Sequence, residues 1–170
     1  MADPLDLAFD PIDRAAQIWA DRFGPSDAMA AATSVMRVQQ LLLAEFDRIC
    51  RPHGVTFARY EALVLLSFSR TGALPMAKIG ERLMVHPTSV TNTIQRLEAA
   101  GYVVREPNPR DGRGTLARIT DLGREVVEKV TKELMAADFG LGALDATGRA
   151  QVFDVLRDVR VAAGDFRWNG

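Results

Sequence analysis

The middle of the chain, residues 75–120, has an order of predicted elements that few folds share. Apolar residues three and four apart predict two short helices, and the second helix ends at Gly101. A polar segment rich in Pro, Gly and Arg then lies between two strand-like runs. In order, we expect helices over residues 75–84 and 87–100, a strand over 102–105, a hairpin over 106–115 and a strand over 116–119. This order is typical of a winged helix-turn-helix, whose second helix can enter a DNA major groove.

The second helix of this module has an apolar and a polar side. Val90, Ile94 and Leu97 are at positions i, i+4 and i+7, so we expect them to be buried together. The other side is rich in short hydroxyl and amide side chains, which are poor helix formers but suit hydrogen bonds to phosphates and base edges. The predicted DNA contacts are Thr88, Ser89, Thr91, Asn92, Gln95 and Arg96. The alternative is an ordinary solvated helix surface.

The hairpin carries Arg110 and Arg113 near its tip. Gly112 and Gly114 permit the left-handed backbone of a tight turn. An arginine at a narrow tip can enter an A·T-rich minor groove, and Asp111 is expected to orient Arg113 through an ion pair. We therefore add Arg110 and Arg113 to the predicted DNA contacts, with a plain exposed hairpin as the alternative.

Helices are also expected on both sides of this module. Apolar spacing predicts them over residues 11–23, 26–51, 56–70, 120–139 and 147–163, with Ser26, Thr56 and Thr120 as caps. The terminal helices carry more apolar surface than a monomer would expose. We expect a mainly α fold with a two-strand β-wing. Residues 1–55 and 121–170 would form a dimerisation region and residues 56–120 a DNA-binding lobe, in one intertwined fold.

The net charge of −1 does not by itself indicate a nucleic-acid partner. Its distribution is more informative, because residues 76–120 hold seven basic and four acidic side chains, whereas residues 1–34 hold two basic and six acidic ones. A modest basic module on an acidic body fits a DNA-binding protein that uses few phosphate contacts.

Composition excludes several other classes. No apolar run approaches the ~18 residues of a membrane span. The N-terminal sequence has neither the basic nor the apolar region of a signal peptide. Cys50 is the only cysteine, which excludes an internal disulfide and suits a reducing compartment. We therefore expect a cytoplasmic protein with no membrane partner.

No residue pattern predicts an enzyme, a metal site or a cofactor. His53 and His86 are the only histidines and lie far apart in the sequence, without a cluster of other ligands. There is no nucleophile–base pair and no glycine-rich phosphate loop. We expect His86, which precedes Pro87, to help begin the second helix of the module.

Cys50 follows Leu43 and Phe46 in the apolar stripe of the long helix over residues 26–51, so we expect it to be buried. A reactive thiol instead needs a polar or electropositive setting. Arg48 and Arg51 keep open the alternative of a redox-sensing regulator based on Cys50.

Two segments of the chain resemble the MarR family of bacterial transcriptional regulators. They are residues 87–103, PTSVTNTIQRLEAAGYV, and residues 111–124, DGRGTLARITDLGR. The most specific marks are Arg96-Leu-Glu followed by Gly101, and the Asp-x-Arg wing that ends in a hydrophobe-Thr step. The resemblance covers roughly residues 35–163. Gly112 departs from the pattern, because many members have a second arginine there.

The resemblance implies a ligand-responsive repressor. Its terminal helices would interleave in a homodimer that binds a palindromic operator in double-stranded DNA, and a small anionic or aromatic effector would release the DNA. A winged helix used for protein–protein assembly is the alternative from another functional class.

The predicted N-terminal helix is similar to one found in a subgroup of this family that responds to urate and related anions. In that subgroup a tryptophan with nearby acidic and arginine residues forms the pocket, and Trp19, Glu61 and Arg105 match by position. Glu61 is an aspartate in the subgroup, and Thr93 stands where an arginine is expected. The implied ligand-binding residues are Trp19, Glu61 and Arg105; packing on the dimer core is the alternative for Trp19.

Overall fold

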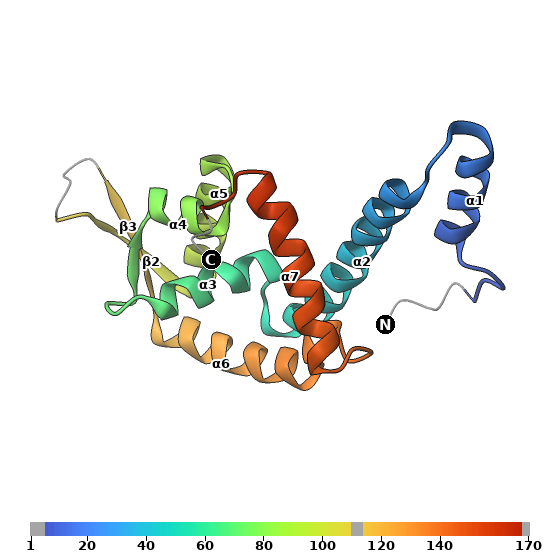
Figure 1. Ribbon diagram of the computed structural model, residues 1–170. Helices are drawn as coiled ribbons and strands as arrows, with labels where there is room; N and C mark the ends of the chain where they lie inside the picture. The colour runs from blue at the N-terminus through green and yellow to red at the C-terminus, as the bar shows by residue number, and fades with distance from the viewer. Residues whose placement is uncertain (1–5, 110–113, 168–170) are drawn as a thin grey trace.

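The computed structural model describes residues 6–109 and 114–167. Helices dominate this part of the chain, with a small sheet at one end of the molecule and the first helix at the other (Figure 1). The mainly α fold predicted from the sequence is confirmed. In chain order, the elements are α1 (Pro11–Phe23), α2 (Asp27–Cys50), η1 (Arg51–His53), α3 (Phe57–Phe68), β1 (Ala73–Pro75), α4 (Met76–Leu83), α5 (Pro87–Ala99), β2 (Val103–Pro107), β3 (Thr115–Ile119), α6 (Asp121–Ala136), η2 (Asp138–Gly140) and α7 (Ala146–Ala162).

Two of the helices begin where local capping chemistry predicts. The ring nitrogen Nδ1 of His86 accepts a hydrogen bond from the backbone N–H of Thr88 at 3.3 Å, which starts α5. The hydroxyl of Thr120 accepts from the N–H of Gly123 at 3.1 Å, which starts α6. Both bonds satisfy backbone donors that a first helical turn leaves unpaired.

Two predicted caps occupy the right positions without making the expected bonds. Ser26 and Thr56 precede α2 and α3, but neither side chain accepts a capping hydrogen bond. The carboxylate of Asp47 accepts from the N–H of Phe57 at 2.8 Å instead. The start of α3 is therefore fixed by a residue of α2, a contact that local sequence does not reveal.

The two predicted wing strands are present as β2 and β3, and the sheet has a third strand, β1, that the sequence did not predict. The strand order is β1-β3-β2, and both pairings are antiparallel. Pro75 was expected inside the first helix of the module, but it ends β1, opposite Leu116, and α4 begins at the next residue. The backbone N–H of Ile119 also donates to Gly72 at 2.9 Å. A three-residue strand at a sheet edge leaves too short a pattern to recognise.

The core lies between α3, α5, α6, the sheet and the end of α2. Its most completely buried large side chains are Leu63, Leu66, Ile79, Ile94, Leu97, Leu134, Val103, Val130 and Cys50. Phe68, the last residue of α3, is 79% exposed. It lies on the side of α3 opposite Leu63 and Leu66, because successive helical residues turn by about 100°.

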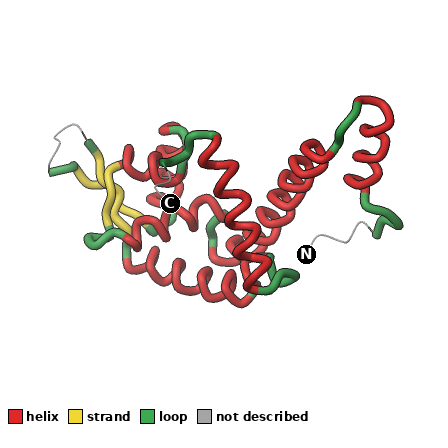
Figure 2. Tube along the Cα trace, viewed as in Figure 1, coloured by secondary structure: helices red, strands yellow, loops and turns green. Residues whose placement is uncertain are grey.

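The terminal helices bury very little within one chain. No residue of α1 or α7 is buried, and in α2 only Ile49 and Cys50 are. α1 and the first part of α2 project away from the rest of the molecule (Figures 1 and 2). Large apolar side chains are exposed along all three helices, among them Trp19, Met36, Leu43, Phe153, Val155 and Val159. None of the described helices is long and apolar enough to cross a membrane.

α6 starts directly against the backbone of the residue that precedes β2. A Cβ atom added to Gly123 would lie 2.4 Å from the carbonyl oxygen of Tyr102 and 2.8 Å from Cγ1 of Ile119. The same carbonyl oxygen accepts from the N–H of Thr120 at 3.0 Å. This close approach joins the sheet end of the molecule to the long helix α6.

Gly123→Ala should therefore destabilise the protein. We expect the free energy of unfolding to fall by about 1–3 kcal/mol, because the added methyl group meets fixed backbone atoms. Chemical denaturation measures this loss. Gly142→Ala is the matched control, since its new Cβ would have no heavy atom nearer than 3.6 Å. Equal stability of the two variants would contradict the packing described for Gly123.

Candidate nucleic-acid interface

The buried side of α5 is formed by three residues of one apolar stripe. Val90, Ile94 and Leu97 are 3%, 0% and 0% exposed, which confirms their predicted burial. They belong to the same core cluster as Leu63 and Leu66 of α3. With this stripe buried, the rotation of α5 about its axis is fixed, and the opposite side must face solvent.

The polar side of α5 is accessible along its whole length. All six residues predicted to contact DNA from this helix are exposed: Thr88, Ser89, Thr91, Asn92, Gln95 and Arg96. The hydroxyl of Thr91 donates to the carbonyl oxygen of Pro87 at 3.1 Å. Within the described part of the chain, the side chains of Asn92, Gln95 and Arg96 have no hydrogen-bond or ion-pair partner. These groups are therefore available to an external ligand.

Glu98 does not neutralise the nearby Arg96. It instead pairs with Arg105 of β2, whose Nε and Nη2 lie 2.7 and 2.6 Å from Oε2 of Glu98. The hydrogen bond from Arg105 lowers the pKa of the Glu98 carboxyl, and the same bond raises the pKa of the Arg105 guanidinium. Sequence reasoning missed this pair because it spans a turn between a helix and a strand.

The strands β2 and β3 form the described part of the wing and extend away from the helices (Figure 1). The carboxylate of Glu106 makes two hydrogen bonds with Arg118 of β3, at 2.8 and 2.9 Å. Arg118 also donates to the carbonyl oxygen of Thr71 at 2.7 Å. The predicted contacts Arg110 and Arg113, with Asp111 and Gly112, lie outside the described residues, so those predictions stay untested.

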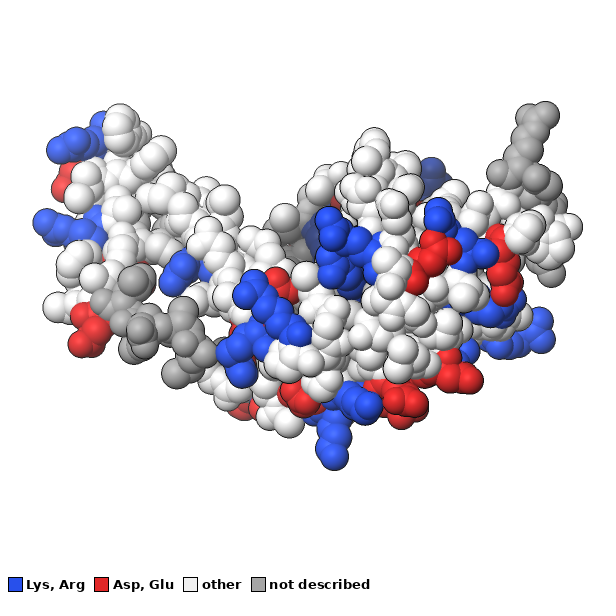
Figure 3. Space-filling view, turned by 180° about the vertical axis from the view of Figure 1, so that it is seen from behind, with Lys and Arg blue, Asp and Glu red and all other residues white. Residues whose placement is uncertain are grey.

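Surface charge is mixed. On the side opposite the view of Figure 1, basic and acidic side chains are interspersed (Figure 3). α4 shows the same mixture, because Lys78 pairs with Glu81 at 2.9 Å. The charged surface is therefore not uniformly basic, and any attraction of the protein for phosphate must come from a few local basic groups.

The three residues matched to an effector pocket are not gathered within one chain. Trp19 is 41% exposed on α1, where its ring centroid lies 5.0 Å from that of Phe23. Arg105 lies on β2, at the opposite end of the molecule from α1 (Figure 1). Glu61 is exposed on α3. A pocket that includes all three residues would require Trp19 from a second chain.

Cys50 and His53, the other two residues considered in the sequence, have structural surroundings. Cys50 is fully buried, and burial together with the charge of Asp47 raises the pKa of its thiol to about 11. These are properties of an unreactive cysteine. His53 Nε2 lies 2.8 Å from Glu133 Oε1, and the described residues contain no cluster that could hold a metal ion.

Comparison with known proteins agrees with this geometry. A sequence profile of the MarR family matches residues 53–114. An HTH-type transcriptional regulator from Bacillus subtilis (strain 168), YkoM, is 36% identical over 83 residues, which are 49% of this chain and 53% of YkoM. The chain thus spans only about half the length of that relative.

Two solved structures extend the similarity. Sco5413, a MarR family transcriptional regulator from Streptomyces coelicolor, is 64% identical with a TM-score of 0.77, covering 83% of this chain and 98% of Sco5413. Sco3205, a MarR family regulator from the same organism solved in complex with DNA, is 25% identical with a TM-score of 0.71, covering 77% of this chain and 84% of Sco3205. The extent of the match to Sco5413 and the matching helix-turn-helix show that the chain belongs to the MarR family of transcriptional regulators.

Proposed function

We propose that this protein is a DNA-binding transcriptional repressor that acts in the cytoplasm as a homodimer on a palindromic operator. The exposed polar side of α5 carries the proposal, because Asn92, Gln95 and Arg96 face solvent without partners in the described chain. Amide and guanidinium groups at this spacing suit hydrogen bonds to base edges in a major groove. The DNA complex of the related Sco3205 supports the same use of the fold.

The exposed apolar surface supports the homodimer. α1, α2 and α7 leave many large apolar side chains in solvent, more than a stable monomer usually exposes. A second copy of the chain would cover them, with residues 1–55 and 121–170 as the dimerisation region. Two copies of α5 would then be about 34–36 Å apart, as successive major-groove half-sites require.

An anionic or aromatic effector is the proposed ligand. Trp19 offers an aromatic surface, Arg105 a cation, and Glu61 a hydrogen-bonding carboxyl on α3. In the proposed dimer, α1 of one copy would approach the DNA-binding lobe of the other. An effector releases DNA only if it binds the free and DNA-bound states with different affinity.

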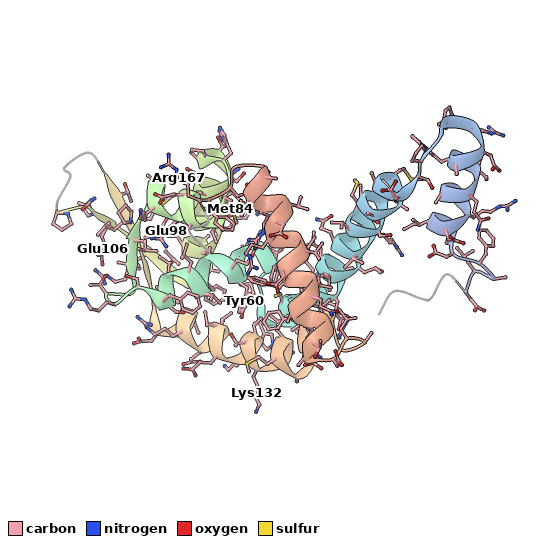
Figure 4. All side chains as sticks on the ribbon, in the orientation of Figure 1. Tyr60, Met84, Glu98, Glu106, Lys132 and Arg167 are labelled. Atoms are coloured by element: carbon pink, nitrogen blue, oxygen red, sulfur yellow. The ribbon has the colours of Figure 1, made fainter. Side chains whose placement is uncertain are left out.

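Replacing Gln95 with Ala should weaken discrimination between operator and random DNA by about 1–3 kcal/mol, the value of one well-placed base contact. Arg96→Ala should weaken binding and reduce its dependence on salt. Fluorescence anisotropy with duplex from the upstream region of the gene measures both effects. Lys132→Ala is the control for Arg96, because it removes the same charge from α6, where the side chain points away from α5 (Figure 4). An unchanged preference in Gln95→Ala would exclude base reading by that residue.

Sedimentation should give about twice the chain mass of 18.6 kDa down to micromolar concentration. Val155 and Val159 are 64% and 62% exposed and lie four residues apart on α7. Replacing both with Asp should shift the protein to monomer and abolish operator binding, because charges at an apolar interface stay unpaired. A wild-type monomer that binds the operator would contradict the dimer.

An effector should quench Trp19 fluorescence and release DNA over the same concentration range. We would titrate aromatic carboxylates and purine-derived anions into protein carrying Trp168→Phe, which leaves Trp19 as the only indole. The Trp19→Ala, Arg105→Ala double variant should no longer release DNA when the same compounds are added. Equal release of DNA from wild type and double variant would place the effector site elsewhere.

A further inference from the structure

Two neighbouring residues of β2 attach this strand to different parts of the molecule. Arg105 pairs with Glu98 in the last turn of α5, and Glu106 pairs with Arg118 of β3. Successive residues of a strand point to opposite sides. One side of β2 is thus bound to α5, and the other is bound across the sheet to Arg118, which also donates to the carbonyl oxygen of Thr71.

The connection between α5 and β2 contains one residue with a left-handed backbone conformation, Gly101, whose φ is 76°. The N–H of Gly101 donates to the carbonyl oxygen of Glu98, and that of Tyr102 donates to Leu97, both at 2.9 Å. These bonds end the helix. They lie within the turn, however, whereas the Glu98–Arg105 pair joins the helix to the strand beyond it.

We propose that Glu98 and Arg105 are positioning residues that hold the β2–β3 wing at a fixed angle to α5, so that helix and wing meet DNA together. This inference rests on the proposed DNA-binding function and concerns groups that do not themselves need to touch DNA. Two guanidinium nitrogens meet one carboxylate oxygen, which restricts the pair more than a single contact does.

The Glu98–Arg105 pair is too exposed to contribute much to the stability of the fold. The Arg105 and Glu98 side chains are 43% and 33% exposed, and ion pairs with this much solvent contribute little to folding. Binding is more sensitive, because α5 and the wing must lie at a matching angle to meet DNA together, and a less restricted wing must be ordered again on every encounter with DNA. Loss of the pair should thus change DNA affinity while the melting temperature stays nearly constant.

Glu98→Gln separates positioning from simple electrostatics. The substitution removes a negative charge from the DNA-binding lobe, and by charge alone it should strengthen attachment to phosphate. The positioning role predicts the opposite, a loss of operator affinity of about fivefold, as expected for one ion pair. Glu81→Gln is the matched control: it removes the same charge from the same lobe, but among the described residues Glu81 pairs with Lys78 of its own helix and not with the wing.

The experiment measures operator affinity, melting temperature and a hydroxyl-radical footprint for the full-length protein. We expect Glu98→Gln to bind about fivefold more weakly and to lose protection at the outer edges of the footprint, while Glu81→Gln binds as well as wild type or better. The charge-reversed Glu98→Arg, Arg105→Glu double variant restores the pair without changing net charge, and it should recover the edge protection.

Affinity of Glu98→Gln equal to or above that of wild type would overturn the positioning role. So would a weaker affinity accompanied by uniform loss of the footprint and a much lower melting temperature, which would indicate general destabilisation. Absence of DNA binding by the wild-type protein would overturn the proposed function as well, so the two failures are distinguishable.

Discussion

The arrangement of the groups proposed to contact DNA depends on the burial of one side of α5. Val90, Ile94 and Leu97 enter the same core as Leu63 and Leu66 of α3, and their burial leaves no freedom to rotate the helix. The side chains opposite them face solvent as a consequence. An α-helix has only one orientation that buries such a stripe, so the packing of α5 also determines which groups can reach a ligand.

The terminal helices, in contrast to α5, have no buried side within one chain. α1 and α7 form as regular helices, yet no residue in either is buried within the chain. Isolated helices of this length are marginal in water, and most helices in proteins are stabilised by packing of an apolar side. Phe153, Val155 and Val159 on α7 are exposed in a single chain, and the proposed homodimer would bury them. A second copy is the simplest cover for a surface of this extent.

The sequence predicts the parts of this fold that local chemistry decides. The cap at Thr120 and the buried stripe of α5 depend on residues within one or two turns, and both are confirmed. β1 is not predicted, because three residues form a strand only when a distant partner, β3, is beside them. The Glu98–Arg105 pair is not predicted either, because its geometry depends on how the chain turns at Gly101. The DNA contacts and the effector pocket remain predictions, since their partners are separate molecules.

Arg105 belongs both to the proposed effector site and to the ion pair that is proposed to position the wing for DNA. Its guanidinium already binds the carboxylate of Glu98, so an anionic effector that draws on this group must replace Glu98 or share it. Sharing is unfavourable because Glu98 and the effector carry like charges, and replacement removes the ion pair that links β2 to α5. By linkage, DNA binding would lower the affinity for the anion by the same factor as the anion lowers the affinity for DNA. A single internal ion pair would thus be sufficient to couple the two sites, without movement of the buried core beneath α5.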